Sequence, residues 1–503
     1  MADGELPWPE RHAGVLLHPT SLPGPFGIGD LGPEAHNFID FLATSGQSLW
    51  QIMPLGPPGM GNSPYSARSA FAGNALLISP ERLLEEGLID ARQLAGAPGG
   101  ADGRVPFDDV ASWKEGLLRC AFARFEARAQ HDEIDAFVAG SAEWLADYTL
   151  YSALRGVDGR GWWDWPPPLA GRNADALAQA TAGLAGEIRY HQFVQWLFFR
   201  QWDAIHQHAR AQGVRIIGDI PIFVALDSAD AWACRHLFKL DAEGRPEAVA
   251  GVPPDAFSDT GQLWGNPLYR WDVLRAEGYG WWVQRFHRAF EAMDLARIDH
   301  FRGFVAAWEV PAGAPTAERG AWVPGPGREL FGAVAARLGE LLIIVEDLGV
   351  ITEDVRALRD ELGYPGMKVL QFAFGDDARN PYLPHNIPPH SVVYTGTHDN
   401  DTTRGWAASL TPGQRARVRA FAGDGADTTA ALMRMAYGSA AEMAIVPMQD
   451  VLRLGSEARM NVPGQPDGNW GWRFRWEQLR PEQVAFLRDS AVLYGRAPRA
   501  AKD

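Results

Sequence analysis

The sequence predicts an α/β fold, a (β/α)8 TIM barrel with large, mostly helical insertions over its C-terminal face. Its apolar runs are continuous rather than alternating, which is typical of parallel strands buried on both faces. The number of runs matches the eight strands of such a barrel, and helical stretches lie between many of them. The predicted strands are residues 14–21, 48–55, 214–223, 295–301, 341–348, 367–374, 391–400 and 444–452.

The predicted helices share an amphipathic or helix-starting pattern. Residues 34–45 are amphipathic, and residues 188–212 carry apolar and aromatic side chains at helical spacing. Residues 352–362 begin with Thr, Glu and Asp, which favour a helix N-terminus, and residues 329–338 also read as a helix. Alternating strands and helices with right-handed crossovers build a parallel sheet.

The spacing of the strands is uneven and predicts the domain organisation. The second run ends at residue 55 and the third begins at residue 214, far more than a crossover needs. We therefore expect residues 1–58 to supply the first barrel strands and residues 59–185 to form an inserted helical subdomain. Residues 186–503 would complete the barrel, with a long cleft loop region at about 225–290. Both insertions should overhang the C-terminal face, where barrel enzymes have their active sites.

Composition excludes several classes of protein. The 503 residues are 46% hydrophobic and 21% charged, which is ordinary for a globular chain. Acidic residues outnumber basic ones by 62 to 46, and this balance disfavours binding to nucleic acid or to a membrane surface. The first residues show no leader, no stretch is apolar enough to span a bilayer, and Cys120 and Cys234 read as buried or idle thiols. We expect a cytoplasmic location.

Tryptophan is unusually frequent, with 20 residues in the chain. Most of them should simply pack in the core. Flat aromatic faces also suit the apolar C–H faces of sugar rings, so some could serve a carbohydrate site.

Acidic residues end four of the predicted strands: Asp219, Asp299, the pair Glu346 and Asp347, and Asp399. A single such acid could cap the next helix. Four on separate strands of one barrel would converge on one mouth, against their mutual repulsion, which favours a shared active site.

Two of these acids have surroundings that favour opposite proton status. Arg297 lies two residues before Asp299, on the same face of a strand, and would favour the ionised carboxylate that a nucleophile needs. Glu346 ends an apolar run, and desolvation there would raise its pKa, as a proton donor requires. Such a pair is what glycoside chemistry uses. The pattern leaves open which of Glu346 and Asp347 faces inward.

Neighbouring residues allow two further interpretations. His300 and His398 adjoin two of the acids and are candidate donors to sugar hydroxyls. Acids at barrel strand ends also bind divalent cations, but a cation beside Arg297 is unfavourable, so we expect no metal and no other cofactor.

Long motifs run in order from about Arg11 to Trp476. They are G-V-L-L-H-P-T-S-L-P-G-P-F-G-I-G-D-L-G at 14–32, W-Q-I-M-P-L-G-P-P at 50–58, N-S-P-Y-S at 62–66, G-D-I-P-I-F-V-A-L-D-S-A-D at 218–230, G-V-P-P-D-A-F-S-D-T-G-Q-L-W-G-N-P-L-Y at 251–269, A-R-I-D-H-F-R-G-F at 296–304, V-E-D-L-G at 345–349, G-T-H-D-N-D-T at 396–402 and G-N-W-G-W-R at 468–473. In these motifs the chain resembles the 4-alpha-glucanotransferases of the amylomaltase, or disproportionating enzyme, family.

The resemblance implies roles for individual residues. Asp299 would be the nucleophile, Glu346 the general acid/base, and Asp399 a ligand of sugar hydroxyls that supports the distorted ring. One departure is Ala256, where some members carry an aromatic residue. The substrate-binding residues implied are Tyr65, Ser63, Asp219, Trp264, Asn266, Arg297, His300 and His398.

The implied reaction is retaining transfer of α-1,4-glucan segments between maltooligosaccharides through a covalent glycosyl-enzyme, with glucose also serving as acceptor. The alternative is an amylase-like hydrolase of α-glucans. A third reading is a glucan-binding protein that has kept the barrel without catalysis.

Overall fold

A closed barrel of eight parallel strands forms the centre of the molecule, in the spatial order β1-β12-β11-β10-β9-β6-β3-β2. The computed structural model describes residues 11–99, 103–128, 131–254 and 258–498. The predicted barrel is therefore confirmed, and each predicted run overlaps one of its strands. These strands are β1 (His12–Leu16), β2 (Leu49–Gln51), β3 (Arg215–Pro221), β6 (Leu295–Asp299), β9 (Ile343–Val345), β10 (Gly366–Val369), β11 (Ser391–Tyr394) and β12 (Met443–Pro447).

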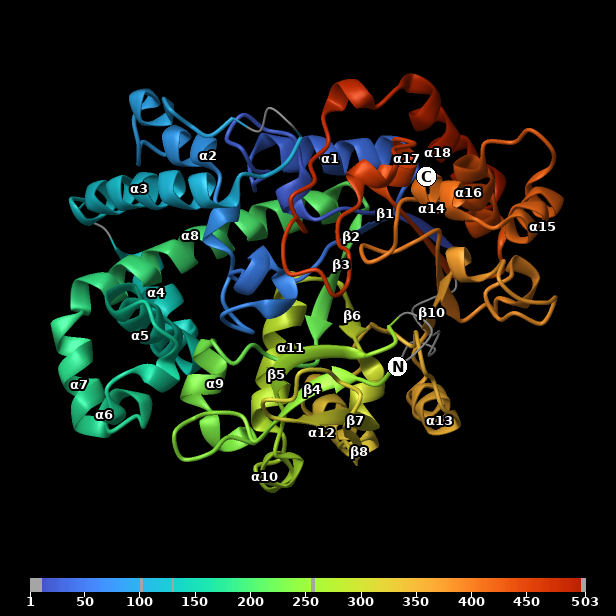
Figure 1. The fold of residues 1–503 in the computed structure, drawn as a ribbon. Helices are drawn as coiled ribbons and strands as arrows, with labels where there is room; N and C mark the ends of the chain where they lie inside the picture. The colour runs from blue at the N-terminus through green and yellow to red at the C-terminus, as the bar shows by residue number, and fades with distance from the viewer. Residues whose placement is uncertain (1–10, 100–102, 129–130, 255–257, 499–503) are drawn as a thin grey trace, which may run out of the picture.

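Helices surround the barrel and extend from it on one side (Figure 1). They are α1 (Pro33–Thr44), α2 (Pro80–Glu85), α3 (Phe107–Glu126), α4 (Asp132–Gly140), α5 (Ala142–Asp158), α6 (Pro167–Ala170), α7 (Ala174–Gly183), α8 (Ala185–Ala211), α9 (Ala229–Ala233), α10 (Trp271–Ala276), α11 (Gly280–Ala292), α12 (Arg328–Leu338), α13 (Glu353–Leu362), α14 (Thr403–Ser409), α15 (Pro412–Ala422), α16 (Thr428–Gly438), α17 (Met448–Val451) and α18 (Pro481–Leu493).

The register between parallel strands decides which side chains meet at the barrel mouth. In the pairing of β3 with β6, Asp219 lies opposite Arg297 and Pro221 lies opposite Asp299. In the pairing of β6 with β9, Ile298 lies opposite Val345, the residue before Glu346. Acidic residues far apart in the sequence are thereby placed at similar heights on neighbouring strands.

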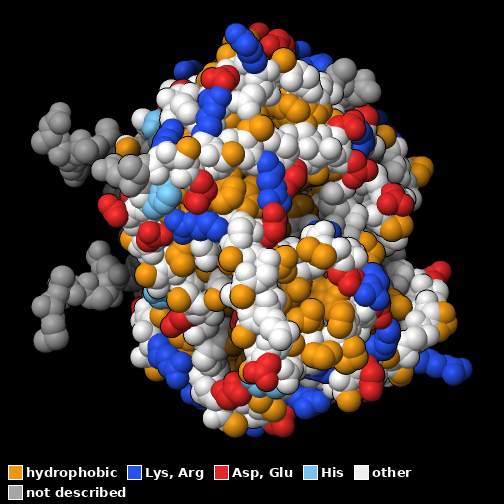
Figure 2. Space-filling view, turned by 90° about the vertical axis from the view of Figure 1, so that its left-hand side faces the viewer, with side chains coloured by type: hydrophobic (Ala, Val, Ile, Leu, Met, Phe, Trp, Pro, Cys, Tyr) orange, Lys and Arg blue, Asp and Glu red, His pale blue; other side chains and the backbone are white. Residues whose placement is uncertain are grey.

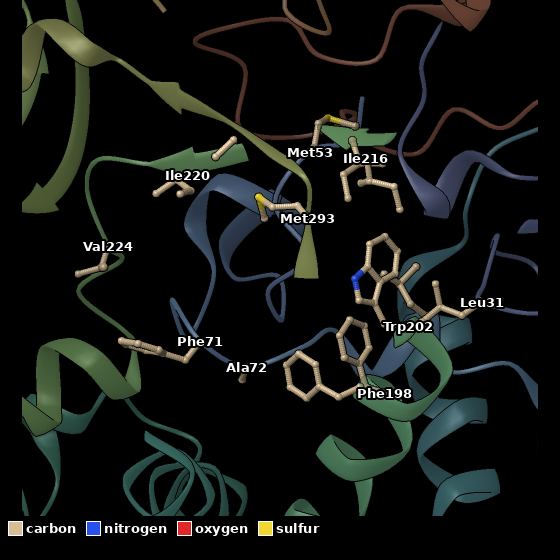
Figure 3. Packing of buried hydrophobic residues seen from close by; sticks show 14 of the residues in the cluster. Leu31, Met53, Phe71, Ala72, Phe198, Trp202, Ile216, Ile220, Val224 and Met293 are labelled. Carbon is tan, nitrogen blue, oxygen red and sulfur yellow. The ribbon is translucent and has the colours of Figure 1, made fainter. Parts of the chain in front are cut away.

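Helix α8 joins the inserted helices to the barrel. Its apolar side chains, Phe198 and Trp202 among them, pack toward Met293 and Ile216 (Figure 3). The indole of Trp202 also donates to the carbonyl of Ala292 at 2.8 Å. A cavity of about 100 Å³ lies in this layer, lined among others by Phe71, Phe198 and Met293.

Residues 59–185 contain α2 to α7 and carry the helices seen on the left of Figure 1. Figure 2 shows the face turned to that side, with basic, acidic and hydrophobic side chains interspersed over it. The buried amine of Lys114 donates to the carbonyls of Leu76 and Ile78, within this part, at 2.6 and 2.8 Å. It also lies 3.7 Å from Asp30, in the segment between β1 and α1.

A second sheet lies beside the barrel in the order β5-β4-β7-β8, with all neighbours antiparallel. Residues 225–290, expected as a long loop region, contain two of its strands together with α9, α10 and α11. Sequence patterns did not predict these four strands because they are short and partly exposed. They are β4 (Ala248–Val252), β5 (Gln262–Pro267), β7 (Ala306–Pro311) and β8 (Ala321–Pro324).

Two predictions about side chains and membranes can be compared with the structure. Cys120 is exposed and Cys234 is half-buried, and both thiols are free. Within the described ranges, no helix combines the length and the apolar character needed to cross a bilayer.

We expect Gln195→Leu to lower the free energy of unfolding by about 2–4 kcal/mol. The Gln195 amide accepts from the N–H of Gly73 at 2.7 Å and donates to its carbonyl at 3.0 Å, and leucine would leave both buried groups unpaired. Gly73 packs closely against Phe198, because a Cβ there would lie 1.9 Å from the Phe198 ring. Urea unfolding measures the effect. Gln207→Leu, on the exposed face of the same helix, should change stability by less than about 0.5 kcal/mol.

Candidate active site

The acids predicted from the strand ends converge at the C-terminal mouth of the barrel. Asp219 lies within β3 and Asp299 is the last residue of β6. Glu346 follows β9 directly, and Asp399 lies five residues beyond the end of β11. Arg297 joins Asp219 to Asp299, and backbone hydrogen bonds hold Glu346 beside them.

Arg297 bridges two of the carboxylates. Its Nη1 donates to Asp219 Oδ2 at 2.7 Å and to Asp299 Oδ1 at 2.9 Å. The guanidinium is almost fully buried, with 4% of the side chain exposed. Burial alone would lower the pKa of Arg297, but the carboxylates of Asp219 and Asp299 raise it well above the ordinary value. A permanent cation therefore sits between the two acids.

Asp219 is the buried member of this pair. Burial raises its pKa to about 7, with a further contribution from Asp299, while Arg297 opposes the shift. The hydroxyl of Tyr65 donates to the same oxygen, Oδ2, at 2.8 Å. Asp219 thus fixes both the Arg297 guanidinium and the Tyr65 ring.

Glu346 is held beside Asp299 by the backbone. Its N–H donates to the carbonyl of Ile298 at 3.0 Å, and its carbonyl accepts from the N–H of Phe301 at 3.2 Å. The side chain accepts from the N–H of His300 at 2.8 Å and from that of Leu348 at 3.0 Å. His300 has φ 49°, a left-handed conformation that a non-glycine residue rarely adopts, and it accompanies this contact.

Burial raises the pKa of Glu346 to about 8. Arg297 and the N–H of Leu348 act in the opposite direction, and the charges of Asp299 and Asp347 add to the rise. This rise favours the protonated form of Glu346 at neutral pH, while Asp299 lies in an ion pair with Arg297. The neighbouring Asp347 belongs elsewhere: it accepts from Arg359 and from the N–H of Met367, both at 2.7 Å. Of the two acids that the sequence could not separate, Glu346 is the one that faces the site.

Asp399 lies on the opposite side, between the barrel and the C-terminal part of the chain. Its Oδ2 lies 3.4 Å from Nε2 of His398, and its Oδ1 accepts from Asn461 Nδ2 at 2.6 Å. Burial lowers the pKa of His398, so its ring is neutral and can donate or accept one hydrogen bond on each nitrogen. The His398 ring stacks on Tyr65, with centroids 5.1 Å apart.

The other predicted binding residues lie around this centre with different tasks. Trp264 is 38% exposed and sets its ring edge-on against His300, with centroids 4.7 Å apart. Ser63 accepts from the N–H of Tyr65 at 3.2 Å, and Asn266 donates to the carbonyl of Val224 at 2.9 Å. The hydrogen bonds of Ser63 and Asn266 therefore shape loops. Ala256 lies outside the described residues.

Sequence reasoning missed three residues at the site, all from the C-terminal segment. Asn461 contacts the Asp399 carboxylate, and Arg459 donates to the Asp399 carbonyl at 2.6 Å. The Trp470 ring lies 5.7 Å from that of Tyr65 and 5.9 Å from that of His398. The motif at 468–473 signalled that this segment matters, but not which side chains it contacts.

Burial, charge and hydrogen bonding at this mouth suit chemistry between two carboxyl groups of opposite proton status. Within the described part of the chain, no three His, Cys, Asp or Glu side chains are grouped so as to hold a metal ion.

A family model described as 4-alpha-glucanotransferase matches residues 17–479. The chain belongs to this family. It is 52% identical to the 4-alpha-glucanotransferase of Thermus thermophilus over 500 residues, covering 97% of this chain and 99% of the relative. It is 48% identical to the 4-alpha-glucanotransferase of a Synechocystis strain over 498 residues, covering 97% and 98% of the two chains.

A solved structure supports the same assignment. The amylomaltase of Streptococcus agalactiae, in complex with acarbose, superposes with a TM-score of 0.95 at 37% identity, covering 97% of this chain and 100% of that one. The family predicted from the motifs is confirmed, and with it the expectation of a glucanotransferase enzyme.

We expect Arg297→Met to destabilise the fold by about 3–5 kcal/mol near neutral pH, because Asp219 and Asp299 would lose their buried counter-ion. Without the cation, Arg297 no longer opposes the rise that burial gives the pKa of Asp219, so this carboxyl binds its proton more tightly. Carboxyls with raised pKa values contribute stability at low pH and lose it as pH rises, so the loss should be larger at pH 8 than at pH 5. Denaturant unfolding at both pH values tests this. Arg297→Lys keeps the charge and should show a much weaker pH dependence; equal loss at both pH values in Arg297→Met would contradict the reasoning.

Proposed function

We propose that this chain transfers α-1,4-glucan segments from one maltooligosaccharide to the 4-hydroxyl of another by double displacement with retention. The observation that supports it most is the pair of Asp299 and Glu346 at the ends of adjacent strands, one in an ion pair with Arg297 and the other half-buried with a raised pKa. A nucleophile must be ionised and a proton donor must be protonated, and these surroundings favour that division.

In the first step Glu346 gives its proton to the leaving glycosidic oxygen, while an Asp299 oxygen attacks the anomeric carbon. The bond from that carbon to the leaving oxygen breaks, and the bond to Asp299 forms. In the second step Glu346, now ionised, takes the proton of an incoming sugar 4-hydroxyl. That oxygen displaces Asp299, which returns to the carboxylate, and Glu346 is protonated again.

The remaining residues would hold the reacting sugar. The Asp399 side chain is 44% exposed, and a carboxylate there can accept hydrogen bonds from sugar hydroxyls. The stacked rings of Tyr65 and His398 offer a flat surface for the apolar face of the same sugar. Arg297 preserves the charge of Asp299 during approach of the substrate.

Transfer requires that a sugar outcompete water at the covalent intermediate. Leu263 and Trp264 are exposed on β5, and the Trp264 ring lies against His300. An aromatic platform there can bind an acceptor sugar and exclude water, which favours transfer over hydrolysis. Glucose and short maltooligosaccharides are the proposed acceptors. We place the reaction in the cytoplasm, which two free thiols suit.

With maltotriose as the only substrate, the enzyme should produce glucose and a ladder of longer chains, without a net rise in reducing ends. Chromatography of the products with a reducing-end assay measures this. Asp299→Asn should lose at least about 1,000-fold in turnover and still bind maltooligosaccharide, because only the nucleophile is removed. Hydrolysis products alone would favour the amylase-like alternative, and binding without turnover in the unaltered chain would favour a non-catalytic glucan-binding protein.

The rate should fall as pH rises through about 8. Because burial raises the pKa of Glu346 to about that value, its proton is present below this pH and is lost above it. A pH profile of kcat/KM for maltotriose measures this limb. In Glu346→Gln the donor reaction should fall at least about 100-fold, whereas a glycosyl fluoride, whose leaving group needs little protonation, should still release fluoride in a burst. The matched variant Asp347→Asn should keep the alkaline limb and move it only slightly to lower pH, because the Asp347 charge is the smallest cause of the rise. Loss of the fluoride burst in Glu346→Gln would show that Glu346 does more than supply the proton.

A further inference from the structure

A segment near the C-terminus crosses the site from outside the barrel. We call residues 456–474, which lie in the chain between α17 and α18 in Figure 1, the C-terminal strap. Three of its parts are fixed to distant segments. Ser456 donates to Asp401 at 2.7 Å, Ser21 donates to the carbonyl of Trp472 at 2.6 Å, and the N–H of Val105 donates to the carbonyl of Gly471 at 2.7 Å.

Asp399 needs an external partner to hold its carboxylate in one orientation. It lies on the loop after β11, and 44% of its side chain is exposed. The last torsion of an Asp side chain is broad and nearly two-fold, so the backbone alone does not fix the carboxylate plane. His398 is 3.4 Å from Oδ2, which is long for a hydrogen bond between nitrogen and oxygen.

Asn461 of the strap provides that partner. Its Nδ2 donates to Asp399 Oδ1 at 2.6 Å, a short bond to a charged acceptor. The Asn461 backbone is fixed as well: its N–H donates to the carbonyl of His398 at 3.1 Å, and its carbonyl accepts from Arg459 Nε at 2.8 Å. Arg459 in turn donates to the carbonyl of Asp399. The amide therefore approaches Asp399 from a backbone that is itself docked on the same loop.

We infer that Asn461 is a positioning residue that orients the Asp399 carboxylate toward the hydroxyls of the sugar being transferred. This inference rests on the proposed function, because it assumes that Asp399 binds that sugar. With Oδ1 held by Asn461, the second oxygen stays available to the substrate in a fixed direction. Removing the amide leaves Asp399 in place but free to rotate, so sugar binding and turnover weaken while the fold persists.

The test is a double-mutant cycle with Asn461→Ala, Asp399→Ala and the double variant. Two quantities are measured in each: the affinity for acarbose by calorimetry, and kcat and KM for maltotriose. We expect Asn461→Ala to lose about 10- to 100-fold in affinity and in kcat/KM, the value of one hydrogen bond to a charged group. In the Asp399→Ala background the same change should have less than about a 3-fold effect, because the group on which it acts is gone.

Matched variants separate positioning from general damage. Gln465→Ala removes an exposed side chain of the same strap and should leave affinity and turnover unchanged. Asn461→Asp keeps the size but sets a carboxylate against Asp399, and it should lose more affinity than Asn461→Ala. If circular dichroism shows that Asn461→Ala does not fold, Asn461→Ser replaces it in the same double-mutant cycle.

Additive losses in the cycle, or unchanged acarbose affinity in Asn461→Ala, would overturn the inference. Neither result would affect the proposed function, which stands or falls with the maltotriose products of the unaltered chain.

Discussion

The ion bridge made by Arg297 is the interaction on which the rest of the site depends. Carboxyl groups in a barrel mouth lose water and repel one another, and both effects favour their neutral forms. Glu346 shows this outcome, and Asp219 is shifted in the same direction. Asp299 shares the Arg297 guanidinium with Asp219 but differs from it in exposure, with 28% of its side chain open to water against 1% for Asp219. One cation thus permits an anion and a proton-bearing acid to stand on adjacent strands.

The barrel supplies the geometry that this bridge needs. Parallel pairing of β3 with β6 sets Asp219 opposite Arg297, and residues two apart on β6 share a face, so Asp299 lies next to the same guanidinium. Pairing of β6 with β9 then delivers Glu346 to the backbone of Ile298 and Phe301. No loop is required to bring these three acids together, and strand register is among the most rigid features of a fold.

Features encoded in single strands could be predicted from the sequence. Continuous apolar runs predicted the eight barrel strands because these are buried on both faces. The strands of the second sheet are short and partly exposed, and they carry no comparable run.

Periodicity could not separate Glu346 from Asp347 because the run before them is apolar at every position. In the structure the two acids have different partners. Asp347 accepts a hydrogen bond from Arg359 on the following helix, and Glu346 accepts one from the backbone N–H of His300. The role of Asn461 could not be predicted from the sequence, because its partner Asp399 lies 62 residues away and no local pattern links the two.

The division of tasks between barrel and peripheral segments follows from what each can hold rigid. The groups proposed to exchange protons and form the covalent bond lie at the ends of β6 and β9, where backbone hydrogen bonds between the two strands hold them. The groups proposed to contact sugar hydroxyls and faces, Tyr65, His398 and Asp399, lie on loops and depend on contacts from elsewhere in the chain. Tyr65 depends on Asp219 through its hydroxyl, and Asp399 depends on the strap through Asn461 and Arg459. A sugar-binding surface built this way can vary in its outer segments while the reacting pair stays unchanged.

The strap also pairs with residues 103–105 of the inserted part, through the bridge of Arg104 with Trp472. The insert is therefore connected through the strap to the loop that carries Asp399.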